Sequence, residues 1–171
     1  MTRTPFRALA AACVAALGVT LASAQEARQP AAKAVTDAEF VTKAASGGLF
    51  EVKSSKLALE KATKAECKHF AEMMIKDHTK ANDELKAAAA KAGVPLPAEL
   101  APHHQKMLND LKAARDFDAA FVDAQLKSHV EAVDLFTAAS ASVKDPGLRD
   151  FAVKTLPTLK MHLDHVKKHA K

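Results

Sequence analysis

The chain has 171 residues, with 25 lysines and arginines against 20 aspartates and glutamates, and a formal net charge of +5. Trp and Tyr are absent and only five glycines occur, so the composition favours helices and leaves little from which to build strands. The basic residues alternate with acidic ones and no aromatic residues interleave them, so we do not expect nucleic acid binding.

Residues 1–24 have the pattern of a cleavable signal peptide. Arg3 and Arg7 precede an apolar run from Leu9 to Leu21, and small residues at 22–24 offer a cleavage site before Gln25. No later stretch approaches the roughly 20 apolar residues that a membrane-spanning helix needs. We therefore expect secretion to the periplasm and a mature part, residues 25–171, without a transmembrane segment.

Cys67 is the only cysteine of this expected mature part, so an intramolecular disulfide bond is excluded there. The residue is either a buried, small apolar side chain, which is the common state of a free cysteine, or a reactive thiol.

The mature part reads as a disordered lead-in, residues 25–35, followed by one helical domain, residues 36–171. The lead-in consists of small and polar residues with Pro30. Thr36 and Glu39 then have the spacing of a capping box, and apolar residues at three- and four-residue steps predict a helix over 37–62. A second helix is predicted over 65–92, ending at Gly93.

The second half of the domain predicts a short crossover helix over 102–114 and two long helices over 117–141 and 147–169. Pro157 lies inside the last of these and should bend it. Short connections near residues 63–64 and 143 make consecutive helices antiparallel neighbours. The predicted fold is all-α, an antiparallel four-helix bundle with a crossover helix between its second and third long helices.

Each long helix carries one ionisable residue on or beside its apolar stripe: Glu51, His78, His129 and His162. Neutral imidazole is the commonest metal ligand, and helical bundles build metal sites from core Glu and His residues. Counted from the connecting turns, Glu51 and His78 differ in height by roughly 3 Å, and His129 and His162 by roughly 7–8 Å. These four residues are the predicted metal ligands, and the height difference makes His162 the weakest of them.

A Glu and His set suits Fe, Mn, Zn or Cu, and Met74 and Met161 would favour Cu(I) if they turned inward. The bound ion would serve storage, sensing or protection. The alternative is a non-catalytic envelope interaction or stress-related module, whose partner the sequence does not identify, with a structural polar core and no metal. An enzyme with Glu51 as its base would need a substrate-sized cavity, and no hydrolase or nucleotide-binding motif supports an enzymatic activity.

Several short segments, taken in order, resemble a family of exported bacterial proteins described as domain of unknown function 4142. They are residues 37–40, 48–52, 70–78, Phe117-Asp118, His129, Phe151-Ala152, Leu156-Pro157 and His162. The resemblance covers nearly all of the mature part. It implies a ferritin-like antiparallel four-helix bundle in the periplasm or envelope, and it implies no particular activity.

Carried onto this chain, the family pattern falls on Glu51, Asp77, His78, Asp118, His129, Pro157 and His162. Di-iron bundles need a Glu three residues before each ligand His. In this chain the residues three positions before His78 and His162 are Ile75 and Leu159. The sequence therefore argues against ferroxidase and O₂-activating chemistry.

Overall fold

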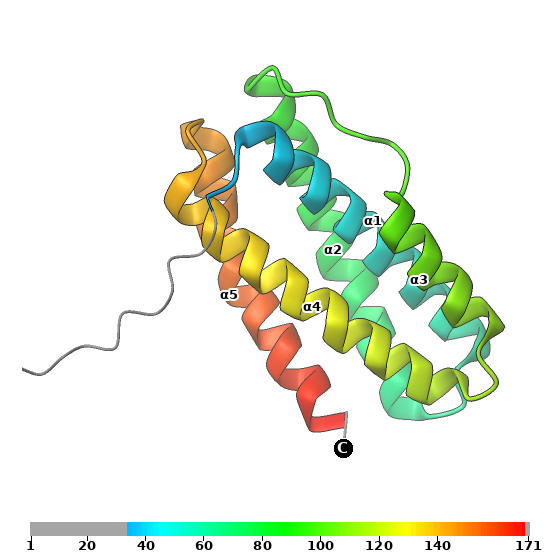
Figure 1. Ribbon diagram of the computed structural model, residues 1–171. Coiled ribbons are helices and arrows are strands. Elements are labelled where there is room, and N and C mark those ends of the chain that lie inside the picture. Colours follow the sequence, from blue (N-terminus) through cyan, green and yellow to red (C-terminus); the bar gives the residue numbers. More distant parts are fainter. Residues whose placement is uncertain (1–33, 170–171) are drawn as a thin grey trace, which may run out of the picture. The chain divides into compact units, whose positions relative to one another are not determined.

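The computed structural model describes residues 34–169, and every regular element among them is an α-helix. In chain order these are α1 (Asp37–Lys61), α2 (Ala65–Lys91), α3 (Pro102–Ala113), α4 (Phe117–Ser142) and α5 (Pro146–His169) (Figure 1). The all-α prediction is confirmed, and each predicted helix end lies within one residue of the observed one. The predicted signal peptide, residues 1–24, lies outside the described residues.

The helix ends follow the local signals in the sequence. At the start of α1, Thr36 Oγ1 accepts a hydrogen bond from the backbone N–H of Glu39 (3.2 Å), and Glu39 Oε2 accepts one from the backbone N–H of Thr36 (3.0 Å). This is the predicted capping box. After α2, Gly93 adopts a φ of 68°, a left-handed conformation that glycine enters at little cost. Helix α5 continues through Pro157.

The predicted disordered lead-in, residues 25–35, falls outside the described residues except for its last two. Of these, Val35 is held in place: its backbone N–H donates to Ser142 Oγ at 2.9 Å, and its side chain packs on the apolar core. The end of α4 thus supplies Val35 with a hydrogen-bond partner that the local sequence does not reveal.

The four long helices pack side by side around a shared core. Helix α1 contacts α2 and α4, and α5 contacts the same two helices, while α3 lies against α1 and α4 (Figure 1). Only residues 62–64 join α1 to α2, and only residues 143–145 join α4 to α5, so each of these pairs runs antiparallel. Among the described residues, no helix combines the length and the apolarity that crossing a membrane requires.

The core has two large apolar clusters, a smaller one formed by Phe50, Met107 and Leu108 where α3 packs on α1, and buried polar residues between the two large clusters. One cluster includes Phe40, Leu85, Phe136 and Leu148, and the other includes Phe70, Met74, Phe121 and Val166. On each long helix the residues between the two clusters are polar and buried: Ser46, Glu51, Ser54 and Ser55 on α1, His78 on α2, Gln125, Ser128 and His129 on α4, and His162 on α5. Burying polar groups lowers the free energy of unfolding unless they find partners, so this layer is a candidate functional site.

Asp118 ties the turn between α1 and α2 to the start of α4. Its carboxylate accepts hydrogen bonds from the backbone N–H groups of Thr63 and Lys64 and from the Thr63 hydroxyl. Burial of Asp118 acts to raise its pKa, but the hydrogen bonds from Thr63 and Lys64 outweigh burial and lower the pKa. The carboxylate therefore supplies the side-chain cap that α2 lacks at its own N-terminus.

We expect Asp118→Asn to lower the free energy of unfolding by about 1–3 kcal/mol, because an amide cannot accept all of these hydrogen bonds. Asp116→Asn is the matched control, since Asp116 caps α4 through the N–H of Ala119 and asparagine is an equally good N-cap. Chemical denaturation followed by circular dichroism measures both variants. Equal stabilities of the two variants would contradict the role given to Asp118.

Candidate metal centre

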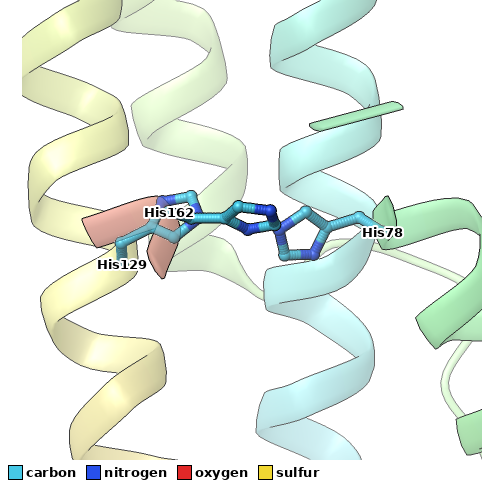
Figure 2. A group of neighbouring side chains, drawn as sticks. All are labelled: His78, His129 and His162. Carbon is cyan, nitrogen blue, oxygen red and sulfur yellow. The ribbon is translucent and has the colours of Figure 1, made fainter. Parts of the chain in front are cut away.

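Three buried histidines from three helices meet in the polar layer. His78 of α2, His129 of α4 and His162 of α5 place their imidazole rings next to one another (Figure 2), with ring centroids 5.5–5.6 Å apart. One potential ligand atom from each residue lies within 4.8 Å of the other two. The three side chains are at most 6% exposed.

Hydrogen bonds orient two of these rings. His129 Nδ1 lies 2.9 Å from the backbone carbonyl oxygen of Gln125, and His162 Nε2 lies 3.0 Å from Asp77 Oδ2. A carbonyl or carboxylate oxygen only accepts, so both ring nitrogens must carry the proton and donate. In the neutral imidazoles, His129 Nε2 and His162 Nδ1 then present lone pairs.

Those lone pairs have no hydrogen-bond partner among the described residues. His129 Nε2, His162 Nδ1 and also His78 Nε2 are buried and unpaired. A buried polar atom without a partner costs about 1–3 kcal/mol, and three of them in one cluster call for an explanation. A cation held between the rings provides one, because each imidazole already has the orientation, and two have the outer hydrogen bond, that metal-binding histidines use.

The surroundings favour the neutral form of His78 and His162. Burial, followed by the neighbouring His129 and His162, lowers the pKa of His78 well below its usual value. Burial also lowers the pKa of His162, although the hydrogen bond to Asp77 acts in the opposite direction. Neutral imidazole is the form that binds metals, so both shifts favour the binding-competent form of these two residues.

Glu51, the fourth predicted ligand, lies beside the cluster. Its Oε1 accepts a hydrogen bond from the Ser128 hydroxyl and lies 3.7 Å from His129 Nδ1, while Oε2 is buried without a partner. Burial raises the pKa of Glu51, against the opposing effects of His129 and Ser128. Among the described residues no bond joins Glu51 to His78, the pair that the height estimate favoured. Both instead line one cavity.

The height estimate for His162 was wrong, because this residue is a full member of the cluster. The estimate counted turn residues as if they advanced along the helix axis. From the observed helix ends, His129 lies 13 residues before Ser142 and His162 lies 16 after Pro146, which leaves an offset of about 4.5 Å. Helical side chains also lean toward the helix N-terminus, and in these antiparallel helices that lean brings the two rings toward each other.

Other predicted features are placed away from the cluster. Met161 is 51% exposed and Met74 packs in an apolar cluster with Phe70 and Phe121, so Met161 does not turn inward as a copper ligand would. Cys67 is buried, and burial, followed by the charge of Asp118, raises its pKa to about 11. A thiol with so high a pKa is unreactive, in line with the interpretation of Cys67 as a core residue.

A cavity of about 370 Å³ adjoins the polar layer. Its lining includes the buried residues Glu51, His78 and Ser128 and the exposed residues His103 and Glu131. His103, His104 and Glu131 form a second group with potential ligand atoms within 4.8 Å of one another. Sequence reasoning assigned no role to these histidines, since Glu131 is remote in the chain and no spacing rule connects it to them.

The lowered pKa of His78 predicts a loss of stability in acid. Below pH 6.5, the ordinary His value, an unfolded chain protonates a histidine that the folded metal-free protein keeps neutral. The free energy of unfolding should then fall by up to about 1.4 kcal/mol per pH unit for each such residue. The raised pKa of Glu51 has the opposite effect on stability. As the pH falls, the folded state takes up a proton at Glu51 before the unfolded state does.

Comparison of the wild type with His78→Gln separates the two effects, since Glu51 is common to both. Between pH 6.5 and 5, in EDTA, the variant should lose less stability than the wild type in urea denaturation. His69→Gln is the control, because His69 is 80% exposed, and its slope should equal that of the wild type. A wild-type slope in His78→Gln would refute this assignment.

The fold was compared with solved structures. The protein CopM in its Cu(II)-bound form matches with a TM-score of 0.69 and 21% identity, over 80% of this chain and 97% of CopM. CopM in its Cu(I)-bound form matches with a TM-score of 0.66 and 20% identity, over 78% and 94% of the two chains. A DUF305 fragment from Deinococcus radiodurans has a TM-score of 0.66 and 13% identity, over 78% and 93%. These likenesses concern the fold.

The sequence was compared with curated proteins and with family models. No curated protein matches the chain. The model of the family described as "Domain of unknown function (DUF4142)" matches residues 22–168, which include all four predicted ligands and every helix but the last residue of α5. The chain therefore belongs to the DUF4142 family, as the resemblance in its sequence predicted.

Proposed function

We propose that this protein is an exported, ferritin-like antiparallel four-helix bundle that binds one copper ion through His78, His129 and His162, for storage, sensing or protection. One observation carries the proposal: three buried imidazoles have potential ligand atoms within 4.8 Å of one another, and each ring carries a nitrogen without a hydrogen-bond partner. Two of these nitrogens are fixed as lone-pair donors by the backbone carbonyl of Gln125 and by Asp77. A cation satisfies all three nitrogens at once.

The donor set narrows the choice among Fe, Mn, Zn and Cu. Imidazole suits Zn, Cu and Fe, whereas Mn prefers oxygen ligands, and Cu(II) binds a given nitrogen site more tightly than the other divalent ions. The absence of a Glu at Ile75 and Leu159 removes the ligands of a di-iron centre. The similar structures of CopM hold Cu(II), Cu(I) and Ag, which supports copper.

We assign to Glu51 the role of compensating the positive charge of the bound copper ion. A copper ion bound by three neutral imidazoles brings its whole charge into the core, and a buried charge is costly unless it is paired. The Glu51 carboxyl lies 3.7 Å from the ring of His129 and is held by Ser128. With the ion bound, Glu51 would ionise despite the burial that raises its pKa, because the nearby positive charge favours the carboxylate.

The proposed compartment is the periplasm, reached by cleavage after Ala24. Its support is the basic, apolar and small-residue pattern of residues 1–24. Fractionation of cells that express the full chain, with mass spectrometry of the N-terminus, tests it. Intact chain retained in the cytoplasm would contradict this location.

We expect chelator-stripped, tag-free protein to bind copper more tightly than Zn, Fe or Mn in equilibrium dialysis with elemental analysis. His78→Gln and His162→Gln should each bind one copper fewer per chain than the wild type, while His69→Gln on the exposed surface of α2 should bind as many. Saturation at 100 times the dissociation constant should raise the free energy of unfolding by about 2.7 kcal/mol.

Equal copper binding by the wild type and His78→Gln would refute the buried site. A water molecule between the rings would then account for the unpaired nitrogens. In that case the envelope interaction module with a structural polar core would be the better description, and cross-linking in cells should recover a stable protein partner.

Glu51→Gln separates charge compensation from direct ligation of the metal. Glutamine retains the shape of the side chain and can still accept the Ser128 hydrogen bond, but it cannot ionise. We expect one copper per buried site, as in the wild type, with an affinity about 10–100-fold lower, as for other groups that support metal ligands. Glu60→Gln, on the exposed surface of α1, should leave the affinity unchanged. An unchanged affinity in Glu51→Gln would exclude Glu51 from the site.

A further inference from the structure

The second group of potential ligands lies where the chain is exposed. His103 and His104 occupy the first turn of α3, and Glu131 lies on α4, against which α3 packs. His103 Nε2 and Glu131 Oε2 are 3.2 Å apart, and these two side chains are 47% and 42% exposed. Without a metal, His103 Nε2 donates a hydrogen bond to Glu131 Oε2. A bound cation would replace this proton, which His103 Nδ1 can carry instead, because two ligands on one ion with bonds of about 2.0–2.2 Å are separated by roughly the same distance.

His104 is held in an orientation that suits a ligand. Its ring stacks on Phe50 with centroids 5.5 Å apart, and its Nδ1 lies 2.7 Å from Ser46 Oγ. The Ser46 oxygen also accepts a hydrogen bond from the backbone N–H of Ala101 at 2.8 Å. The direction of the bond between Ser46 and His104 depends on the histidine tautomer. A hydroxyl oxygen has two lone pairs, so in the tautomer with the proton on Nδ1, Ser46 Oγ accepts from His104 as well, and His104 Nε2 then presents the lone pair that a cation would bind.

The exposed group and one member of the buried cluster line the same cavity. The 370 Å³ space is lined by His103, His104 and Glu131 and also by His78 and Glu51. The last two residues are buried, and each has a polar atom without a hydrogen-bond partner. The cavity thus extends from the exposed group of potential ligands to a histidine of the buried cluster, as a path for a cation would.

We propose that His103, His104 and Glu131 form a second transition-metal site, the mouth site, which captures the cation and passes it through the cavity to the buried histidines. The passage to the buried histidines rests on the proposed function, whereas the mouth site does not. Capture exchanges coordinated water for imidazole and carboxylate ligands without any change in oxidation state. A carboxylate beside a cleft also raises the local concentration of cations.

The test uses tag-free, chelator-stripped full-length mature protein and Cu(II) as the only probe. The chain has no Trp or Tyr, so copper–imidazole absorption in the near ultraviolet is measured against little background. The double variant His103→Ala/Glu131→Gln removes the mouth site and leaves the packed His104 in place. The matched control is His69→Ala/Glu72→Gln, which removes another exposed His–Glu pair, 3.7 Å apart, from the surface of α2.

We expect the wild type and the control to bind one Cu(II) more per chain than the mouth-site variant in equilibrium dialysis. Stopped-flow mixing with Cu(II) follows the absorption change over time. The kinetic phase that is present in the wild type and absent in His78→Gln reports copper binding at the buried site. That phase should be slower by about tenfold or more in the mouth-site variant, because the variant no longer concentrates cations at the cavity. All variants are checked for wild-type circular dichroism.

The outcomes separate the two proposals. Wild-type stoichiometry in the mouth-site variant, or the same loss of copper in the control, overturns the mouth site. A lost copper ion with an unchanged loading rate overturns the passage of the ion to the buried site. If His78→Gln keeps the wild-type stoichiometry while the mouth-site variant loses one ion, the proposed function fails and the mouth site stands.

Discussion

Three imidazoles lie in the middle of the helical core, and the polar residues around them are arranged in response to their burial. Apolar clusters pack on both sides of the layer, and of the three histidines only His78 lines the adjoining cavity. The polar atoms of His129 and His162 must therefore find partners inside the protein. The Gln125 carbonyl and Asp77 satisfy the outer nitrogens of His129 and His162. The other nitrogens of these two rings, His129 Nε2 and His162 Nδ1, have no hydrogen-bond partner among the described residues, and a bound cation would remove the cost of burying them unpaired.

The neighbouring polar residues follow from the same constraint. Ser128 holds Glu51 close to His129, so a potential negative charge lies next to the place where a positive charge would enter. Gln125 donates to Ser54, which extends the polar layer to α1. Helix α3 does not contribute to the cluster. Instead it carries His104, which contacts Ser46 and Phe50 of α1 and lines the cavity.

The buried side chains differ from the ligand set of a di-iron bundle. Carboxylates that bridge two irons are replaced by one unbridged Glu51 and by aliphatic residues at Ile75 and Leu159. Folds of this kind host many activities, so the layer of side chains carries the functional argument. Three neutral nitrogen ligands in a buried layer suit the binding of one metal ion better than redox chemistry at a pair of metal ions.

The helices could be predicted from the sequence, because their caps, apolar periodicity and stop signals act between residues close in the chain. The capping box at Thr36, the stop at Gly93 and the short turns were all predictable in this way, as were the four helices that supply Glu51, His78, His129 and His162. Three relations appeared only in the folded structure: His162 joins the cluster, Glu51 lies beside His129, and Glu131 contacts His103. Those relations depend on helix tilt, turn shape and side-chain direction between segments 28 to 85 residues apart, and no local signal encodes them.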